Sequence, residues 1–264
     1  MVDIQNYVFI DGNYLRRAYE DSMRTFFAAV RHTDLDINAL KTSVNASKAF
    51  YYDAIDEDAE DAEVRRSYLD EIRGLPGCHV RQGTITGHAT KKRQKRVDVQ
   101  LAVECLTHAH NKNVWHVTLV AGDLDFEPLV IALVNVVTHV HVLFERRSAA
   151  KGLYQAADVA QEITLESFWR WSKKNFQKLN PIPHFDNTRY GIGTRPQDIT
   201  TIPAQGTWRG RPVLLCTTSG QDGWMLHFPQ QEEDSSMTYR FHDRERLERY
   251  FILERGGAFE WSTS

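Results

Sequence analysis

The sequence predicts a doubly wound α/β domain over residues 1–172, and three observations support this fold class. Short β-branched and aromatic runs, such as YVFI at 7–10 and WHVTLVAG at 115–122, are typical of buried strands. Amphipathic stretches alternate with these runs, and Gly, Pro or Asp marks most boundaries. Strands that alternate with helices imply parallel strands joined by right-handed crossovers.

The elements follow in a regular order. Strands are expected at 7–10, 48–54, 78–86, 115–122 and 139–145, and helices at 14–30, 56–75, 97–110, 125–137 and 165–176. Residues 87–96 are expected to form a loop, and residues 150–163 to close the domain. In the helix at 97–110, the spacing places Val99, Val103, Leu106 and His110 on one face.

The pattern changes after this domain. Residues 173–206 contain four prolines without hydrophobic periodicity, which indicates a linker or an irregular arm. Residues 207–264 combine short apolar runs with an Arg-rich helical stretch at 243–252, which predicts a small, β-rich α+β accessory domain. Its aromatic and Arg-rich segments could contact RNA, a protein partner or a second copy of the chain.

Composition excludes several classes of protein. The net charge of −3 excludes a general polycation, so any nucleic-acid surface must be local. Three widely spaced cysteines without a CxxC pair argue against a disulfide framework and a zinc knuckle. We see no secretory signal and no apolar run of membrane-spanning length, so we expect a cytoplasmic protein without a membrane partner.

Four aspartates occupy the ends and starts of predicted elements. Asp11 follows the first strand, Asp98 opens a helix, and Asp123 and Asp125 follow the fourth strand. Each has an ordinary structural interpretation: a turn residue, a helix N-cap, or acids that stabilise the first turn of a helix.

Together these acids suggest a site. Ligands of doubly wound sheets bind outside the carboxyl ends of the strands. Asp11 and the Asp123/Asp125 pair converge there if the first and fourth strands are neighbours, as in a flavodoxin-like order. Clustered carboxylates repel unless a cation or protons neutralise them, and oxygen-only ligands suit Mg²⁺ or Mn²⁺. Such a pocket beside a basic loop suggests metal-assisted attack on a phosphodiester.

Three motifs carry a family resemblance. VFIDGNYL, KRVDVQLAVECL and LVAGDLDFEPLV occur in this order and resemble the motifs of NYN-domain proteins, the PIN-like ribonuclease group. The third matches the pattern Ser-Gly-Asp-x-Asp-Phe with Ala121 in place of Ser, and the second has Arg96 where the family pattern has Gly. In the first, Asn13 follows Asp11 by two residues, one fewer than in the common form. The resemblance covers about residues 5–165.

The resemblance implies a PIN-like fold and metal-dependent endonucleolytic cleavage of RNA. Asp11, Asp98, Asp123 and Asp125 would hold Mg²⁺ or Mn²⁺, and metal-activated water would attack phosphorus. Asn13 would support the first ligand or face a phosphate, although helix N-capping is an equal interpretation. Glu104 lies about 120° around the helix from Asp98, so it would be a supporting acid behind the site or a solvated residue.

The basic run at 91–96 leads directly into Asp98. Although most charge runs are solvated loops, this position suits contacts to a nucleic-acid backbone. We therefore expect Lys91, Lys92, Arg93, Lys95 and Arg96 to bind substrate.

Three functions compete on the sequence alone. A metal-dependent endoribonuclease is favoured because all four motif aspartates are present, and DNA could also be a substrate. A non-catalytic RNA-binding or regulatory module with a PIN-like fold is the alternative, supported by the departures from the family motifs. A phosphatase or nucleotide hydrolase is a third, but its usual Asp-x-Asp signature is missing after the first strand.

Overall fold

The structure of the chain is a computed structural model that describes residues 5–86, 93–95, 97–136, 138–186, 195–229 and 236–262. Contacts divide the chain into two compact units, residues 1–177 and 178–264, which we describe separately. Within the described ranges, no helix is both long and apolar enough to cross a membrane. All three cysteines are buried free thiols.

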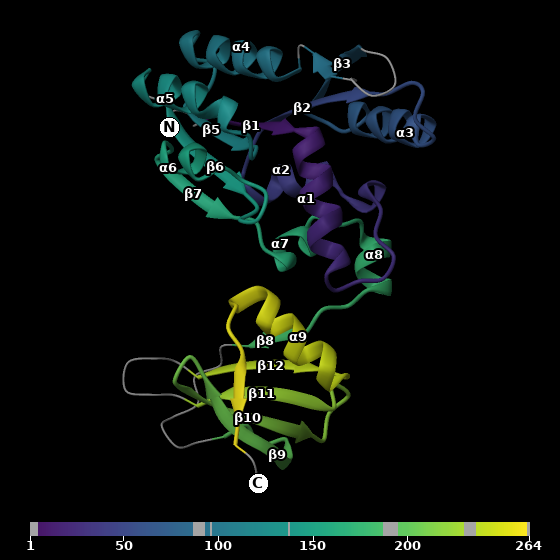
Figure 1. Cartoon of the computed structure of the whole chain (residues 1–264), viewed down its shortest axis with the longest axis vertical. Helices are drawn as coiled ribbons and strands as arrows, with labels where there is room; N and C mark the ends of the chain where they lie inside the picture. Colours follow the sequence, from purple (N-terminus) through teal and green to yellow (C-terminus); the bar gives the residue numbers. More distant parts are fainter. Residues whose placement is uncertain are drawn as a thin grey trace. The chain divides into compact units, whose positions relative to one another are not determined.

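The first unit is built on a seven-stranded sheet with the order β4-β3-β2-β1-β5-β6-β7 (Figure 1). Its strands are β1 (Asn6–Asp11), β2 (Lys48–Ile55), β3 (Cys78–Thr86), β4 (Arg93–Lys95), β5 (His116–Val120), β6 (His139–Phe144) and β7 (Val159–Glu162). Six strands are parallel, and β4 runs antiparallel to β3 at one edge. The predicted α/β fold class is therefore confirmed.

The first and fourth predicted strands, β1 and β5, are neighbours, and Ile10 pairs with Val120. The order around them differs from the flavodoxin-like order that we used. The six parallel strands follow the order 3-2-1-4-5-6, because the chain adds β2 and then β3 on one side of β1 before it crosses back to β5. The topological switch point, where such sheets bind ligands, therefore lies between β1 and β5.

Helices cover both faces of this sheet. The covering helices are α1 (Gly12–Arg24), α2 (Ile37–Ser43), α3 (Ala62–Arg73), α4 (Val97–His110), α5 (Glu127–Asn135) and α6 (Lys151–Gln155). Short 3₁₀ turns η1 (His32–Asp34) and η2 (Leu124–Phe126) lie between them, and α7 (Leu165–Arg170), which contacts α1, and α8 (Lys174–Leu179) follow β7. Side chains of α4, α5 and α6 form one core cluster with alternate residues of the sheet, such as Tyr7 and Phe9. The intervening residues Val8 and Ile10 are also buried, on the face where α1 and α3 pack.

Helix α4 buries a different face from the one that carries Val99 and Val103. Val99 and Val103 are 68% and 59% exposed. The buried residues repeat at intervals of four, starting from the first residue of the helix: Val97, Leu101, Cys105 and Ala109. Valines on both sides of α4 make its apolar pattern ambiguous, and packing on β1 and β2 selects the stripe that includes Cys105.

The second unit is an antiparallel sheet with one helix, consistent with the expected β-rich accessory region. Its strand order is β13-β9-β10-β11-β12-β8, formed by β8 (His184–Asp186), β9 (Ile199–Trp208), β10 (Arg211–Thr218), β11 (Trp224–Phe228), β12 (Met237–Phe241) and β13 (Phe259–Trp261), with α9 (Arg244–Arg255). The segment 173–206, expected to be a linker or arm, contains α8, β8 and most of β9. Pro203 makes this last strand difficult to predict from the sequence, because proline usually interrupts strands.

Candidate active site

The junction between β1 and α1 is organised by Asp11. Asp11 is 9% exposed, and its side chain accepts a hydrogen bond of 3.0 Å from the backbone N–H of Tyr14. It is therefore the N-cap of α1, and Asn13, which we considered as a cap, lies within the first turn. The two interpretations of Asp11, turn residue and site residue, are compatible, because the bond from Tyr14 is accepted by one of its two oxygens, Oδ1.

Two glycines allow close approach around this junction. A Cβ atom at Gly12 would lie 2.7 Å from the carbonyl oxygen of Tyr52 and equally close to the ring of Tyr51. A Cβ atom at Gly122 would lie 2.8 Å from Cδ2 of Tyr14 and closer still to Cε2. The glycines in the DGN and AGD motifs are thus required by packing at the ends of β1 and β5.

A pocket of about 520 Å³ opens at this edge of the sheet. Asp11 and Asp123 both line it, from the ends of the neighbouring strands β1 and β5. Helix α1 forms one side, and the segments after β5 and β6 form the other. The remaining lining residues are Asn13, Tyr14, Arg17, Ala18, Asp21, Gly122, Leu124, Ser148 and Ala150.

The carboxylates in and beside this pocket interact electrostatically. Burial raises the pKa of Asp11 to about 6, with a further contribution from Asp98, against the opposing effect of the Tyr14 N–H. Asp98 is more exposed, but partial desolvation and then the charges of Asp123 and Asp125 raise its pKa as well. All four motif acids therefore lie close enough to influence at least one other member of the set.

The carboxylate oxygens of these residues suit a hard cation, but the described side chains are not arranged as a complete set of metal ligands. No three His, Cys, Asp or Glu side chains within the described ranges are arranged to hold a metal ion. Backbone N–H groups already orient two of the carboxylates: Asp11 accepts from Tyr14, and Asp123 accepts from Asp125 at 3.1 Å. Without a bound cation, these carboxylates are expected to repel one another.

Comparison with known proteins identifies the family. Residues 6–166, more than half of the chain, match the NYN domain. The chain belongs to the NYN domain family. Because NYN domains are generally PIN-like nucleases, membership supports a nuclease or RNA-related role at the level of the family.

Two further comparisons add little to this assignment. A crystal structure of a protein of unknown function from Vibrio parahaemolyticus is 20% identical, with a TM-score of 0.49, and the match covers 62% of this chain and 96% of that one. No curated protein matches the sequence at a significant level.

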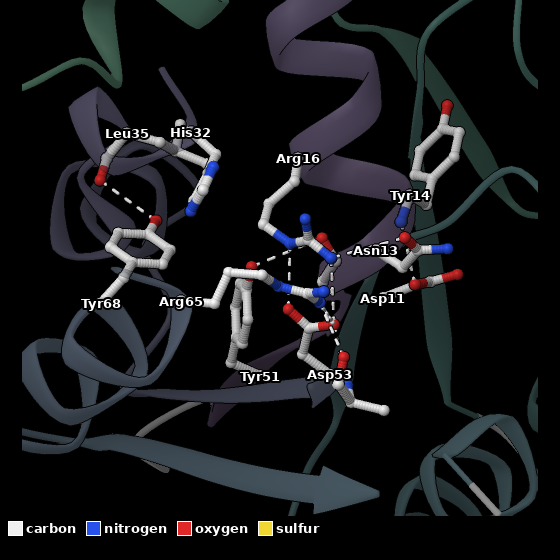
Figure 2. A network of polar contacts seen from close by, with 12 residues as sticks. Asp11, Asn13, Tyr14, Arg16, His32, Leu35, Tyr51, Asp53, Arg65 and Tyr68 are labelled. Carbon is white, nitrogen blue, oxygen red and sulfur yellow. Dashed lines mark hydrogen bonds and ion pairs between the residues drawn. The ribbon is translucent and has the colours of Figure 1, made fainter. Parts of the chain in front are cut away.

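A buried ionic network lies behind the pocket of this NYN domain (Figure 2). Asp53, 1% exposed, accepts hydrogen bonds from Arg16 Nε at 3.0 Å and from Arg65 at 3.1 Å. Arg16 also donates to the amide oxygen of Asn13 at 3.4 Å. Burial alone would lower the pKa of Arg16, but the Asp53 carboxylate outweighs this effect and raises that pKa.

Sequence reasoning missed this network. Asp53 interrupts the apolar strand KAFYYDAI, and a charged residue inside a buried strand was the available signal. Its partners could not be identified, because Arg16 lies 37 residues earlier in the chain. The consequence for the site is that Asn13 has its amide oxygen turned toward Arg16, so it can present its NH₂ group elsewhere.

Glu104 does not belong to the carboxylate pocket. It accepts a hydrogen bond of 2.8 Å from Tyr52 and two short ones from Arg81, at 2.5 and 2.8 Å. Burial would raise the pKa of Glu104, but the hydrogen bonds from Arg81 and Tyr52 outweigh it and lower that pKa. Glu104 thus ties α4, which carries Asp98, to β2 and β3.

The expected substrate-binding loop falls largely outside the described residues. Lys91, Lys92 and Arg96 lie outside them, and so do the side chains of Arg93 and Lys95, whose backbone forms β4. Their role in substrate binding stays a prediction.

Proposed function

We propose that this NYN domain is a metal-dependent endonuclease that cleaves RNA phosphodiesters. The observation that carries the proposal is the placement of Asp11 and Asp123 in one pocket, at the switch point between β1 and β5. The coupling of Asp98 to Asp11, Asp123 and Asp125 adds two further carboxylates to the same region. A cluster of this kind attracts divalent cations, which relieve its repulsion.

In this proposal, Asp11, Asp98, Asp123 and Asp125 hold one or two Mg²⁺ or Mn²⁺ ions. A bound ion would neutralise the carboxylates, activate water and stabilise charge on the phosphate and the leaving oxygen. The chain itself supplies orientation: N–H groups of Tyr14 and Asp125 fix the carboxylates of Asp11 and Asp123 before substrate arrives.

The remaining elements hold this arrangement in place. The network around Asp53 orients Asn13 beside Asp11, and Glu104 anchors the helix that carries Asp98. Substrate would approach along the pocket, and the basic run at 91–96 would contact its phosphates.

A non-catalytic RNA-binding module is the second candidate. The observation in its favour is the lack, among the described residues, of a group of three side chains already arranged as metal ligands. The two candidates predict the same binding to RNA but differ in cleavage.

Cleavage of end-labelled RNA and DNA by the full chain distinguishes them. We expect RNA fragments with Mn²⁺ or Mg²⁺, none with EDTA, and none from Asp123→Asn, which changes the charge but not the shape of the side chain. Asp70→Asn, which removes an exposed acid on α3, is the matched control and should cleave normally. Activity that survives both EDTA and Asp123→Asn would exclude the metal mechanism, and RNA binding without any cleavage would favour the second candidate.

A further inference from the structure

Residues at regular intervals along one face of α1 line the pocket. Asn13, Arg17 and Asp21 are spaced four residues apart, and all three line the pocket. Residues at this spacing occupy neighbouring positions along one side of a helix. The wall that faces the end of β5 therefore carries an amide, a guanidinium and a carboxylate in sequence.

Arg17 differs from the other arginines of α1. Arg16 is bound to the buried Asp53, and Arg24 pairs with Glu20 at 2.7 Å. Arg17 makes no hydrogen bond or ion pair with any described residue, and it is exposed. An exposed arginine without a protein partner keeps its conformational freedom, so Arg17 is available to contact a group that enters the pocket.

The charge of the pocket lining shows which partner fits. Three of its lining residues are acids, namely Asp11, Asp21 and Asp123, and Arg17 is the single cation among the lining residues that the structure describes. A phosphate that approaches these acids is repelled unless a cation contacts it. A guanidinium is well suited to this contact, because its planar fork can donate two hydrogen bonds to phosphate oxygens.

We propose that Arg17 binds a backbone phosphate of a single-stranded nucleic acid next to the carboxylates of Asp11 and Asp123. The inference deepens the proposed nuclease function and rests on it for the placement of the strand. Asn13, whose amide oxygen is held by Arg16, lies one helical turn before Arg17 and offers its NH₂ group to the same backbone. Arg17 is thus a substrate-binding residue, and Arg16 is a positioning residue.

Binding of a short fluorescein-labelled single-stranded RNA tests this inference. Anisotropy titrations on the full chain in Ca²⁺, over a series of KCl concentrations, give the affinity and its dependence on salt. Arg17→Ala should weaken binding by about tenfold or more, the range for a lost hydrogen bond to a charged group. It should also reduce the slope of log K against log salt by about 0.7, the value for one phosphate contact on a single strand.

Two further variants separate charge from fold. Arg17→Lys keeps the charge without the fork and should recover part of the affinity and most of the salt slope. Arg170→Ala removes an exposed arginine of α7 that does not line the pocket, and it should bind like wild type. Thermal unfolding of each variant checks that the fold is retained, as we expect for a substitution at an exposed position.

The result that overturns the inference is Arg17→Ala with the affinity and salt slope of wild type. Cleavage of the same RNA in Mn²⁺ is measured in parallel, because the nuclease function can fail separately. Arg17-dependent binding without cleavage by wild type would support this inference and refute the nuclease function. Cleavage by wild type, together with binding that does not depend on Arg17, would refute this inference and support the nuclease function.

Discussion

Asp53→Asn is expected to destabilise the first unit strongly, because it removes the only negative charge that the described residues place directly against Arg16 and Arg65. The side chains of Asp53, Arg16 and Arg65 are 2%, 11% and 12% exposed, so water cannot readily replace the lost charge. Figure 2 shows both guanidinium groups turned toward this single carboxylate.

The magnitude follows from this burial. Removing one partner of a buried ion pair costs about 3–5 kcal/mol, because the remaining charge is left uncompensated. Asparagine keeps one acceptor oxygen, but its NH₂ group would face guanidinium donors. Since domains are typically stable by about 5–15 kcal/mol, the substitution removes a large share of the free energy of unfolding.

Hydrogen exchange of the full chain, resolved by peptide, is the appropriate assay. It measures opening free energies separately in the two units, whereas tryptophan fluorescence would mix signals from both. Peptides from β1 and β2 should lose about 3–5 kcal/mol of protection in Asp53→Asn, while peptides from β10 and β11 should not change. The matched control is Asp70→Asn, whose surface ion pair with Arg73 is worth about 0–1 kcal/mol.

A loss below about 1 kcal/mol in Asp53→Asn, or a loss equal to that of the control, would refute the assignment of a buried ionic network. A second check uses Arg65→Met combined with Asp53→Asn. If uncompensated charge is the cause, the double variant should be more stable than the sum of the two single effects predicts.

Three further predictions concern other residues of the first unit. Gly122→Ala should lower stability by about 1–3 kcal/mol, measured by hydrogen exchange of peptides from the first unit, because the new methyl group overlaps the ring of Tyr14. Glu104→Gln should cost about 1.5–3 kcal/mol in the same assay, because it weakens charge-assisted hydrogen bonds that join α4 to the sheet. Glu20 has its pKa lowered from 4.5 to about 2, chiefly by the hydrogen bond from the His32 ring. Its contribution to stability should therefore be complete above pH 4.5 and disappear as the pH falls through about 2, so the advantage of wild type over Glu20→Gln should vanish over that window.

Each of these predictions has its own contrary outcome. Gly122→Ala should cost less in a Tyr14→Val background, and an equal cost there would show that the ring contact is not the cause. For Glu104→Gln, a double-mutant cycle with Arg81→Met should reveal coupling, and strict additivity would contradict the proposed link. For Glu20, an unchanged difference between wild type and Glu20→Gln below about pH 2 would mean that the hydrogen bonds with His32 do not depend on ionisation.

The parallel strands could be predicted because they depend on local patterns, and the convergence of Asp11 with Asp123 followed once the first and fourth strands were taken as neighbours. Each strand is a short apolar run, and each acid follows such a run directly. Parallel neighbours bring their carboxyl ends to the same edge of a sheet, so the pairing of β1 with β5 was enough to place both acids in one pocket.

Other features depend on distant contacts and could not be predicted in this way. The order 3-2-1-4-5-6 depends on how many strand positions each crossover connection spans, and no local sequence pattern encodes this number. The buried stripe of α4 could not be selected from the sequence, because valines occur on two sides of the helix. Arg16 and Arg17 are adjacent and chemically identical, yet one is fixed in the interior and the other faces the pocket.

Asp11 has two roles, and this affects how NYN domains can diverge in evolution. Its carboxylate is both a member of the acidic cluster and the cap that starts α1. Asparagine caps helices about as well as aspartate but carries no charge. A single-nucleotide exchange from an Asp codon to an Asn codon would therefore keep the helix while removing one cation ligand. Under the proposed mechanism, a folded domain that still binds RNA but no longer cleaves it is one mutation away, and selection for the fold alone would not remove it.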